Sequence, residues 1–154
     1  MNFLSCRNQI PCIVVNIQSD ATSSIVQLNI FNTKLHLYAK LLSSEVSNLK
    51  LQPDDRVLAC FDSFDVSLSI PTDGLQLSCI NKFNCNEIKV SVQTPTHCEL
   101  VCMLQNNPST KIISTITASS CNAIQSHYKQ DEEQLFHLLV KPSDILLAKM
   151  IKNN

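Results

Sequence analysis

Residues 25 to 31 read Ile-Val-Gln-Leu-Asn-Ile-Phe, and their alternation decides the fold class. Apolar Val26, Leu28 and Ile30 are separated by polar side chains. Because successive side chains of a strand point to opposite faces of its sheet, this pattern predicts a strand with one buried face and one face in water.

Similar short runs lie on both sides of this stretch, separated by turn residues. Between the third and fourth runs, Ser43 or Ser44 can cap a short helix that has Glu45 in its first turn. Several strands with one short helix in about 70 residues predict a small five-stranded barrel of the OB type. The other expected strands are residues 10–17, 34–41 and 56–61.

The same order of elements recurs in the second half of the chain. Ser5-Cys6-Arg7-Asn8 returns as Ser78-Cys79-Ile80-Asn81, an offset of 78 − 5 = 73 residues. A tandem repeat of this period predicts two copies of one module, at residues 1–70 and 78–154, joined by a linker at 71–77. The second copy is expected to have strands at 88–92, 99–104, 111–116 and 135–140, with a capped helical turn after Ser119-Ser120.

Each copy is small for an independent domain. A module of about 70 residues buries only ~60% of the surface that its unfolded chain exposes. We therefore expect exchanged strands, tight packing between the copies, or oligomerisation to complete the core.

The chain has one glycine among 154 residues, which is unusual for an all-β protein. Turns with positive φ normally use glycine, and Asn and Asp are the next best tolerated residues there. The sequence therefore predicts positive φ at Asn32, Asp54, Asn106 and Asn107.

The composition argues against several classes of function. Twelve Lys and Arg residues against 13 Asp and Glu residues give no basic excess for nucleic acid. No apolar run approaches the ~20 residues of a membrane span, and the N-terminus lacks the layout of a signal peptide, so we expect a cytoplasmic protein. Eight cysteines without a Cys-x-x-Cys pair predict buried reduced thiols rather than a metal site. No nucleophile–base pair is apparent, so we do not expect an enzyme or a cofactor.

The two copies differ in where they carry positive charge. The first has Arg7 where the second has Ile80, and the second has Lys141 where the first has Asp62. One cation per copy, at different places, predicts one composite site rather than two identical sites.

Three motifs together resemble the molybdate-binding Mop or TOBE domain (molbindin). The first copy opens with S-C-R-N-Q-I-P at residues 5–11, similar to the family's S-A-R-N-Q-L-P, and L-K-L-Q-P-D-D-R-V at 49–57 is similar to its L-G-L-x-P-G-D-x-V. The second copy ends with V-K-P-S-D-I at 140–145, similar to the family's I-K-A-S-D-V. The first copy departs from the pattern at Asp62 and Phe64, where the family has Lys and Ser.

The resemblance implies that an oxyanion, molybdate or tungstate, is bound between modules for storage, buffering or homeostasis. It also implies a homo-oligomer, a trimer or else a dimer. The alternative is an oxyanion-sensing regulatory or interaction module without its own DNA-binding domain. One Arg, one Lys and several hydroxyl and amide donors would suit a tetrahedral dianion. The implied oxyanion-binding residues are Ser5, Arg7, Asn8, Thr117, Ser120, Lys141 and Ser143.

Overall fold

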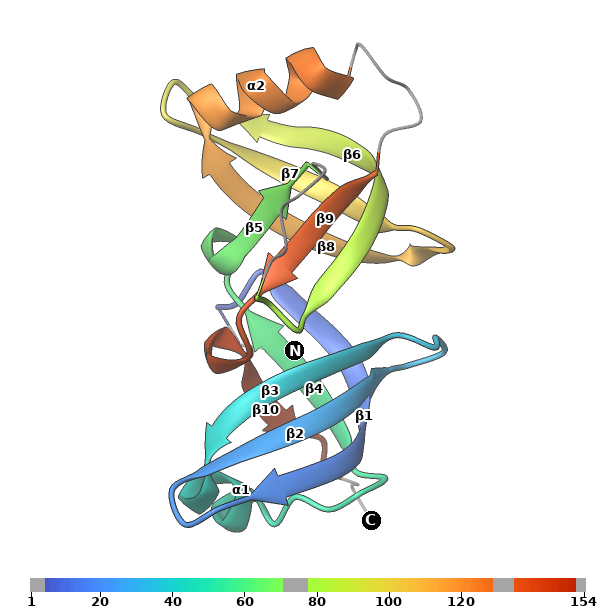
Figure 1. Ribbon diagram of the computed structural model, residues 1–154, viewed down its shortest axis with the longest axis vertical. Helices are drawn as coiled ribbons and strands as arrows, with labels where there is room; N and C mark the ends of the chain where they lie inside the picture. Colours follow the sequence, from blue (N-terminus) through green and yellow to red (C-terminus); the bar gives the residue numbers. More distant parts are fainter. Residues whose placement is uncertain (1–4, 71–77, 129–134, 152–154) are drawn as a thin grey trace. The chain divides into compact units, whose positions relative to one another are not determined.

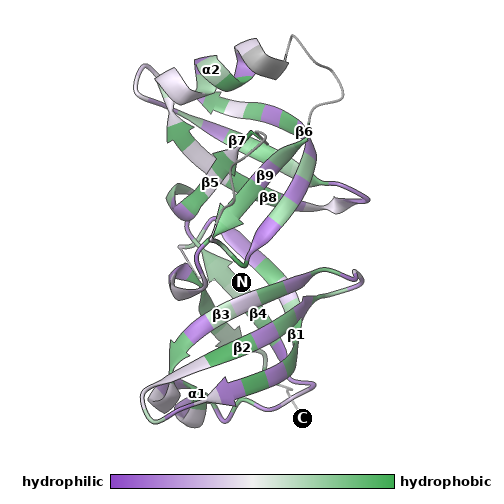
Figure 2. Cartoon of the chain, viewed as in Figure 1, coloured by the Kyte–Doolittle hydropathy of each residue, from purple (hydrophilic) through white to green (hydrophobic). Residues whose placement is uncertain are grey.

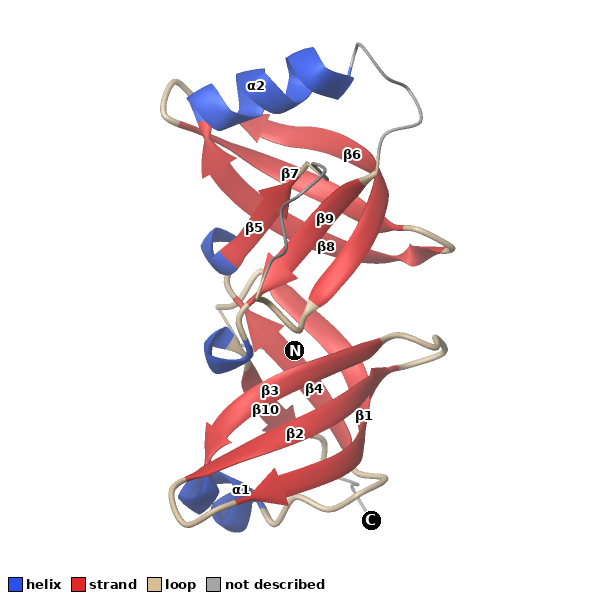
Figure 3. Ribbon diagram, viewed as in Figure 1, coloured by secondary structure: helices blue, strands red, loops and turns tan. Residues whose placement is uncertain are grey.

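The computed structural model describes residues 5–70, 78–128 and 135–151, and strands predominate in it (Figure 1 and Figure 3). The chain forms two compact units. Unit 1 consists of Met1–Asp62 and Lys141–Asn154, and unit 2 consists of Ser63–Val140. No helix in the described part is long and apolar enough to cross a membrane.

Unit 1 contains one five-stranded antiparallel sheet in the order β10-β4-β1-β2-β3. The short helix η2 packs against β3, and β10 also approaches β3, so the sheet curls toward closure. Its elements are β1 (Asn8–Ser19), β2 (Ser23–Ile30), β3 (His36–Leu42), α1 (Ser43–Leu49), β4 (Arg56–Phe61), η2 (Pro142–Asp144) and β10 (Leu146–Lys149).

Unit 2 repeats this plan in the order β5-β9-β6-β7-β8. Here η1 and β5 both approach β8, and the Ser114 hydroxyl donates a 2.7 Å hydrogen bond to the Val66 carbonyl across the closure. The elements are η1 (Ser63–Asp65), β5 (Val66–Ser69), β6 (Lys82–Gln93), β7 (His97–Leu104), β8 (Asn107–Thr117), α2 (Ala118–Tyr128) and β9 (Phe136–Val140). The expected fold class, all-β with tandem OB-like five-stranded barrels and one short helix per repeat, is confirmed.

The fifth strand of each unit comes from the other sequence copy. Strand β5 follows β4 in the sequence but pairs with β9 in unit 2, and β10 follows β9 but pairs with β4 in unit 1. The compact units therefore do not coincide with the sequential domains expected at 1–70 and 78–154. Residues 63–69 belong to the first sequence copy but are part of unit 2, and residues 141–154 belong to the second copy but are part of unit 1. Each barrel therefore buries the apolar side of a strand that its own sequence copy does not supply. The expected linker at 71–77 lies outside the described residues.

Each unit is held by apolar side chains that alternate along its strands, visible as alternating colours in Figure 2. Val26 and Leu28, predicted to face inward, are completely buried, and Ile30 is 2% exposed. Full burial of such a side chain stabilises the fold by about 1.5–3 kcal/mol. The other apolar residues of the core that are exposed by 2% or less are Cys12, Val14, Leu37, Ala39, Val57, Ala59, Cys60, Phe61, Cys85, Cys98, Leu100, Cys102, Leu104, Ile112, Cys121, Phe136 and Leu138.

The positive-φ turns are formed mostly by the residue types expected. Asn32, Asp54 and Asn106 have φ of 60°, 72° and 63°. The prediction of a positive φ at Asn107 is wrong, since Asn107 is already the first residue of β8. The fourth residue with a positive φ is Lys50, at 49°, which was not expected. It is the C-cap of α1, where a left-handed residue closes the last turn of the helix.

The helix starts differ from the expected caps. Helix α1 begins at Ser43, its N-cap residue is Leu42, and no side chain caps it. The Ser43 hydroxyl instead donates to the Asp20 carbonyl at 2.9 Å. In the second copy the helix is longer, and Thr117 precedes it with its hydroxyl oxygen accepting a 3.2 Å hydrogen bond from the Ser120 amide.

Candidate functional site

The opening motif lies at one end of the unit 1 sheet. Ser5 and Arg7 are exposed and precede β1, whereas Asn8 begins β1 and is only 2% exposed. Asn8 pairs with Phe61 in the antiparallel register of β1 and β4. The beginning of β1 therefore lies beside the end of β4.

Lys141 and Ser143 belong to the segment that crosses from unit 2 into unit 1. Lys141 is exposed and directly precedes η2, and Ser143 is exposed within it. Ser143 and Asp144 line a hollow of about 430 Å³ together with residues of β3 and α1, among them Lys40 and Glu45. Beyond this turn, Ile145 is buried and fixes the segment to the unit.

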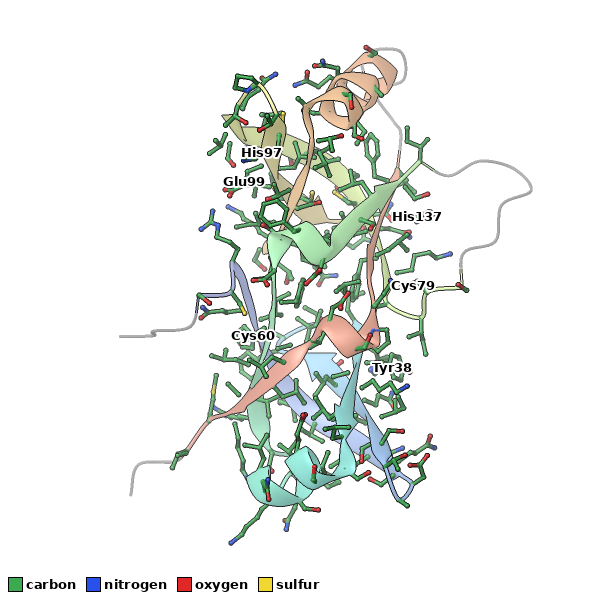
Figure 4. All side chains as sticks on the ribbon, turned by 90° about the vertical axis from the view of Figure 1, so that its left-hand side faces the viewer. Tyr38, Cys60, Cys79, His97, Glu99 and His137 are labelled. Carbon is green, nitrogen blue, oxygen red and sulfur yellow. The ribbon has the colours of Figure 1, made fainter. Side chains whose placement is uncertain are left out.

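The strand register brings these two groups to the same end of unit 1. Gln9 pairs with Cys60, and Cys60 pairs with Leu146, so the three residues form one row across β1, β4 and β10. Cys60, at the middle of this row, is labelled in Figure 4. Neighbouring strands lie about 4.8 Å apart, so the row spans about 10 Å.

Five of the seven predicted residues belong to unit 1, and both predicted cations are among them. They are Ser5, Arg7, Asn8, Lys141 and Ser143. Strand exchange is what combines residues from the two sequence copies here.

The same end of unit 1 also includes Asp62, which directly follows Phe61. In the sequence, Asp62 and Phe64 are the two departures of the first copy from the family pattern. The structure separates these two residues, since Asp62 belongs to unit 1 and Phe64 to unit 2. A carboxylate at this position repels an anion instead of contributing to its binding.

The other two predicted residues, Thr117 and Ser120, lie in unit 2. The Thr117 hydroxyl donates to the Ser120 hydroxyl at 2.8 Å, and a 3.3 Å contact joins it to the Ser119 hydroxyl. These exposed hydroxyls cluster at the N-terminus of α2, where the helix dipole favours negative charge. The structure does not bring this pair into the same unit as the other five.

Unit 2 has apolar groups where unit 1 has donors. Ile80, the counterpart of Arg7, is 60% exposed, and Phe64, the counterpart of Ser143, is 72% exposed. The Phe64 ring lies 6.3 Å from the His97 ring, centroid to centroid. Neither side chain can donate a hydrogen bond to an oxyanion.

Two pairs of polar residues that hold the exchanged segments have no pattern in the sequence that would identify them. Ser63 and Thr115 share a buried 2.7 Å hydroxyl contact in unit 2, and Lys149 forms an ion pair with Asp55 in unit 1. The recurrence of Asp65-Val66-Ser67-Leu68 as Asp144-Ile145-Leu146-Leu147 marks the exchanged segments in the sequence. It does not show which unit receives them.

Most of the thiols lie in the apolar cores of the two units. All eight cysteines are free, and six of them are buried, as expected for most of the thiols; Cys6 and Cys79 are partly exposed. Burial raises the pKa of Cys12 to about 12, so this thiol is neutral at physiological pH. Within the ranges described, no three His, Cys, Asp or Glu side chains form a group that could hold a metal ion.

One histidine of unit 2 has a perturbed environment. His137, labelled in Figure 4, contacts the Asn84 side-chain oxygen at 3.1 Å through Nδ1. Partial burial, with Lys82 nearby, lowers the pKa of His137. This shift favours the neutral imidazole of His137, which lies in unit 2.

Comparison with known proteins supports the predicted kinship. Residues 4–68 match the family model of the TOBE domain. The fold resembles a crystal structure of the cytoplasmic molybdate-binding protein ModG with molybdate bound, at a TM-score of 0.82 and 19% sequence identity, covering 96% of this chain and 99% of that one. No curated protein sequence matches the chain. The predicted resemblance is confirmed at two levels: the first sequence copy matches the TOBE domain, and the fold of nearly the whole chain is similar to that of ModG.

Proposed function

We propose that this protein binds molybdate, or tungstate as a close analogue, in the cytoplasm and acts in storage or buffering of the oxyanion without catalysing a reaction. The observation that supports the proposal is that Arg7 and Lys141, one cation from each sequence copy, both belong to unit 1, where β4 pairs with β1 on one side and with β10 on the other. The TOBE match and the fold of ModG, a molybdate-binding protein, support the choice of ligand.

The chemistry of this end of unit 1 suits a tetrahedral dianion. Arg7 supplies a planar guanidinium and Lys141 an ammonium, and together they can balance two negative charges. Asn8 and Ser143 add neutral donors. Hydrogen bonds to a charged group are worth about 1.5–3 kcal/mol each, so a few of them give micromolar binding after the cost of association.

We assign Thr117 and Ser120 to the same site through oligomerisation, with unit 2 of one copy supplying its hydroxyls to unit 1 of another. A trimer is the assembly that we favour, and a dimer is the alternative. Light scattering that shows a stable 17.2 kDa monomer at micromolar concentration would contradict this assignment.

Calorimetric titration with molybdate, tungstate and sulfate tests the proposal. The parent should bind molybdate and tungstate, and Arg7→Ala and Lys141→Ala should each lose about 10- to 100-fold in affinity, the equivalent of one charged hydrogen bond. Lys34→Ala is the matched control, because Lys34 is an exposed lysine in the turn before β3. If both site variants bind as tightly as the control, the composite site is wrong.

A further inference from the structure

The segment 141–151, which we name the C-terminal arm, carries proposed oxyanion residues at one end and an anchoring residue at the other. Lys141 and Ser143 lie at its beginning, and Lys149 ends its strand β10. The arm leaves unit 2 after Val140 and is part of unit 1. Its docking on unit 1 therefore decides where Lys141 and Ser143 lie relative to Arg7.

The Lys149 ammonium makes three polar contacts, one for each of its N–H donors. It lies 3.0 Å from Asp55 Oδ2, 2.9 Å from the Lys50 carbonyl oxygen and 3.3 Å from the Leu49 carbonyl oxygen. An ammonium group has three donors and no acceptor, so this arrangement satisfies it. The side chains of Lys149 and Asp55 are 29% and 24% exposed, which keeps the pair partly shielded from water.

The acceptors of Lys149 are held in place by unit 1 itself. Asp55 Oδ2 also accepts a 2.8 Å hydrogen bond from the Gln52 amide. Leu49 and Lys50 end helix α1, whose last carbonyls have no partner within the helix. The arm thus supplies a positive charge and donors to a helix C-terminus that lacks a basic residue of its own in its last turn.

The rest of the arm is held over a short length. Only four residues of β10 pair with β4, from Leu146 with Cys60 to Lys149 with Val57. The Met150 amide donates to the Arg56 carbonyl at 2.9 Å, and Leu147 is buried. In so short an edge strand, a slip of one residue would turn Leu147 outward and remove Lys149 from all three acceptors.

The first copy has no such anchor at the corresponding place. With the offset of 79 residues that relates the two exchanged segments, the counterpart of Lys149 is residue 149 − 79 = 70, which is Ile70. The exchanged segment of the first copy is held in unit 2 by the hydroxyls of Ser63 and Ser114 instead. The ammonium anchor is therefore specific to the arm that carries Lys141.

We propose that Lys149 is a positioning residue for the oxyanion site: it fixes the register of the C-terminal arm on unit 1 and so holds Lys141 and Ser143 in place for the anion. The inference rests on the proposed function. Because the complete site exists only when the arm is docked, docking and anion binding stabilise each other by the same free energy. An anion that bridges Arg7 and Lys141 should therefore tighten β10 on β4.

The test compares Lys149→Met, which keeps an unbranched apolar stem but removes the charge, with Lys149→Arg, which keeps the cation. Lys34→Met is the control for loss of an exposed lysine charge. Molybdate affinity is measured by calorimetry, and amide hydrogen exchange of Leu147 to Lys149 is followed by mass spectrometry with and without molybdate. We expect Lys149→Met to lose on the order of 10-fold in affinity, with Lys149→Arg recovering most of it.

In the parent, saturating molybdate should slow exchange in β10, and in Lys149→Met the ligand-free exchange there should be faster. Equal affinity of Lys149→Met and parent would overturn the proposal even if the variant unfolds more easily, and would leave the proposed function standing. Unchanged β10 exchange on saturation of the parent would overturn it as well. Absence of molybdate and tungstate binding by the parent would overturn both. If Lys149→Met does not fold, Asp55→Asn is used in its place, because it removes the carboxylate partner of Lys149. We expect a smaller loss of molybdate affinity for Asp55→Asn, and an unchanged affinity would overturn the proposal.

Discussion

The buried hydroxyl pair of unit 2 makes strand exchange open to a quantitative test. Ser63, on the exchanged segment, is 4% exposed, and Thr115, on β8, is 9% exposed. Their oxygens lie 2.7 Å apart, an ideal distance for a hydroxyl–hydroxyl bond. Removing one partner by mutation leaves the other hydroxyl in an apolar environment, whereas removing both leaves no polar group behind.

The expected magnitudes follow from this asymmetry. Thr115→Val preserves the shape of the side chain and leaves the Ser63 hydroxyl buried without this partner, which should cost about 1–3 kcal/mol of unfolding free energy. Ser63→Ala should cost less, because the Thr115 hydroxyl is closer to solvent. The double variant should be less destabilised than the sum of the two single variants, by about 1 kcal/mol.

Equilibrium urea unfolding of the four proteins at one protein concentration measures this coupling, with Ser67→Ala as the control. Ser67 is an exposed serine on β5, so its loss should change stability by less than about 0.5 kcal/mol. Additive single effects would refute the reasoning, since they would mean that the two hydroxyls do not depend on each other. In that case the exchanged segment would be held by apolar contacts and by the Ser114 bond alone.

Two further predictions concern the ligand and alkaline pH. Titration should give about one oxyanion of this type per chain, because Ile80 and Phe64 cannot replace a guanidinium and a hydroxyl; two equivalent tight sites per chain would contradict this. Stability should fall as pH rises above about 9, because the pKa of Cys12 is raised from 9.0 to about 12 in the folded protein and the unfolded chain loses that proton first. One such thiol contributes about 1.4 kcal/mol per pH unit between those values, so Cys12→Ala should show a shallower decline in urea unfolding across pH 9 to 11.

Local patterns were sufficient for the elements that bury one face within their own copy. The alternation around Val26 and Leu28 predicts β2, and its inward residues are buried as expected. The turns at Asn32, Asp54 and Asn106 follow from the scarcity of glycine, since these residue types tolerate positive φ. The caps of the helices were not predictable in the same way, because Ser43 and Ser120 can satisfy several backbone groups with similar geometry.

The candidate site shows the same division. Arg7 and Lys141 stand out in the sequence because they break the repeat at different places. Arg7 and Lys141 share unit 1 because β10 pairs with β4. In this pairing Leu146 lies opposite Cys60, which is 86 residues earlier in the chain. The division of Asp62 into unit 1 and Phe64 into unit 2 depends on the crossover of the first copy's exchanged segment.

The sequence by itself determined two copies of a small β-barrel module, their kinship and the residue types available to an oxyanion, because alternation, turn chemistry and motifs are properties of neighbouring residues. Only the tertiary structure decided which copy completes which barrel. The two exchanged strands have similar apolar patterns, and each could pair with either fourth strand as far as local chemistry is concerned. The choice is made by contacts between residues far apart in the chain, such as Lys149 with Asp55 and Ser63 with Thr115, and such pairs leave no periodic signal in the sequence.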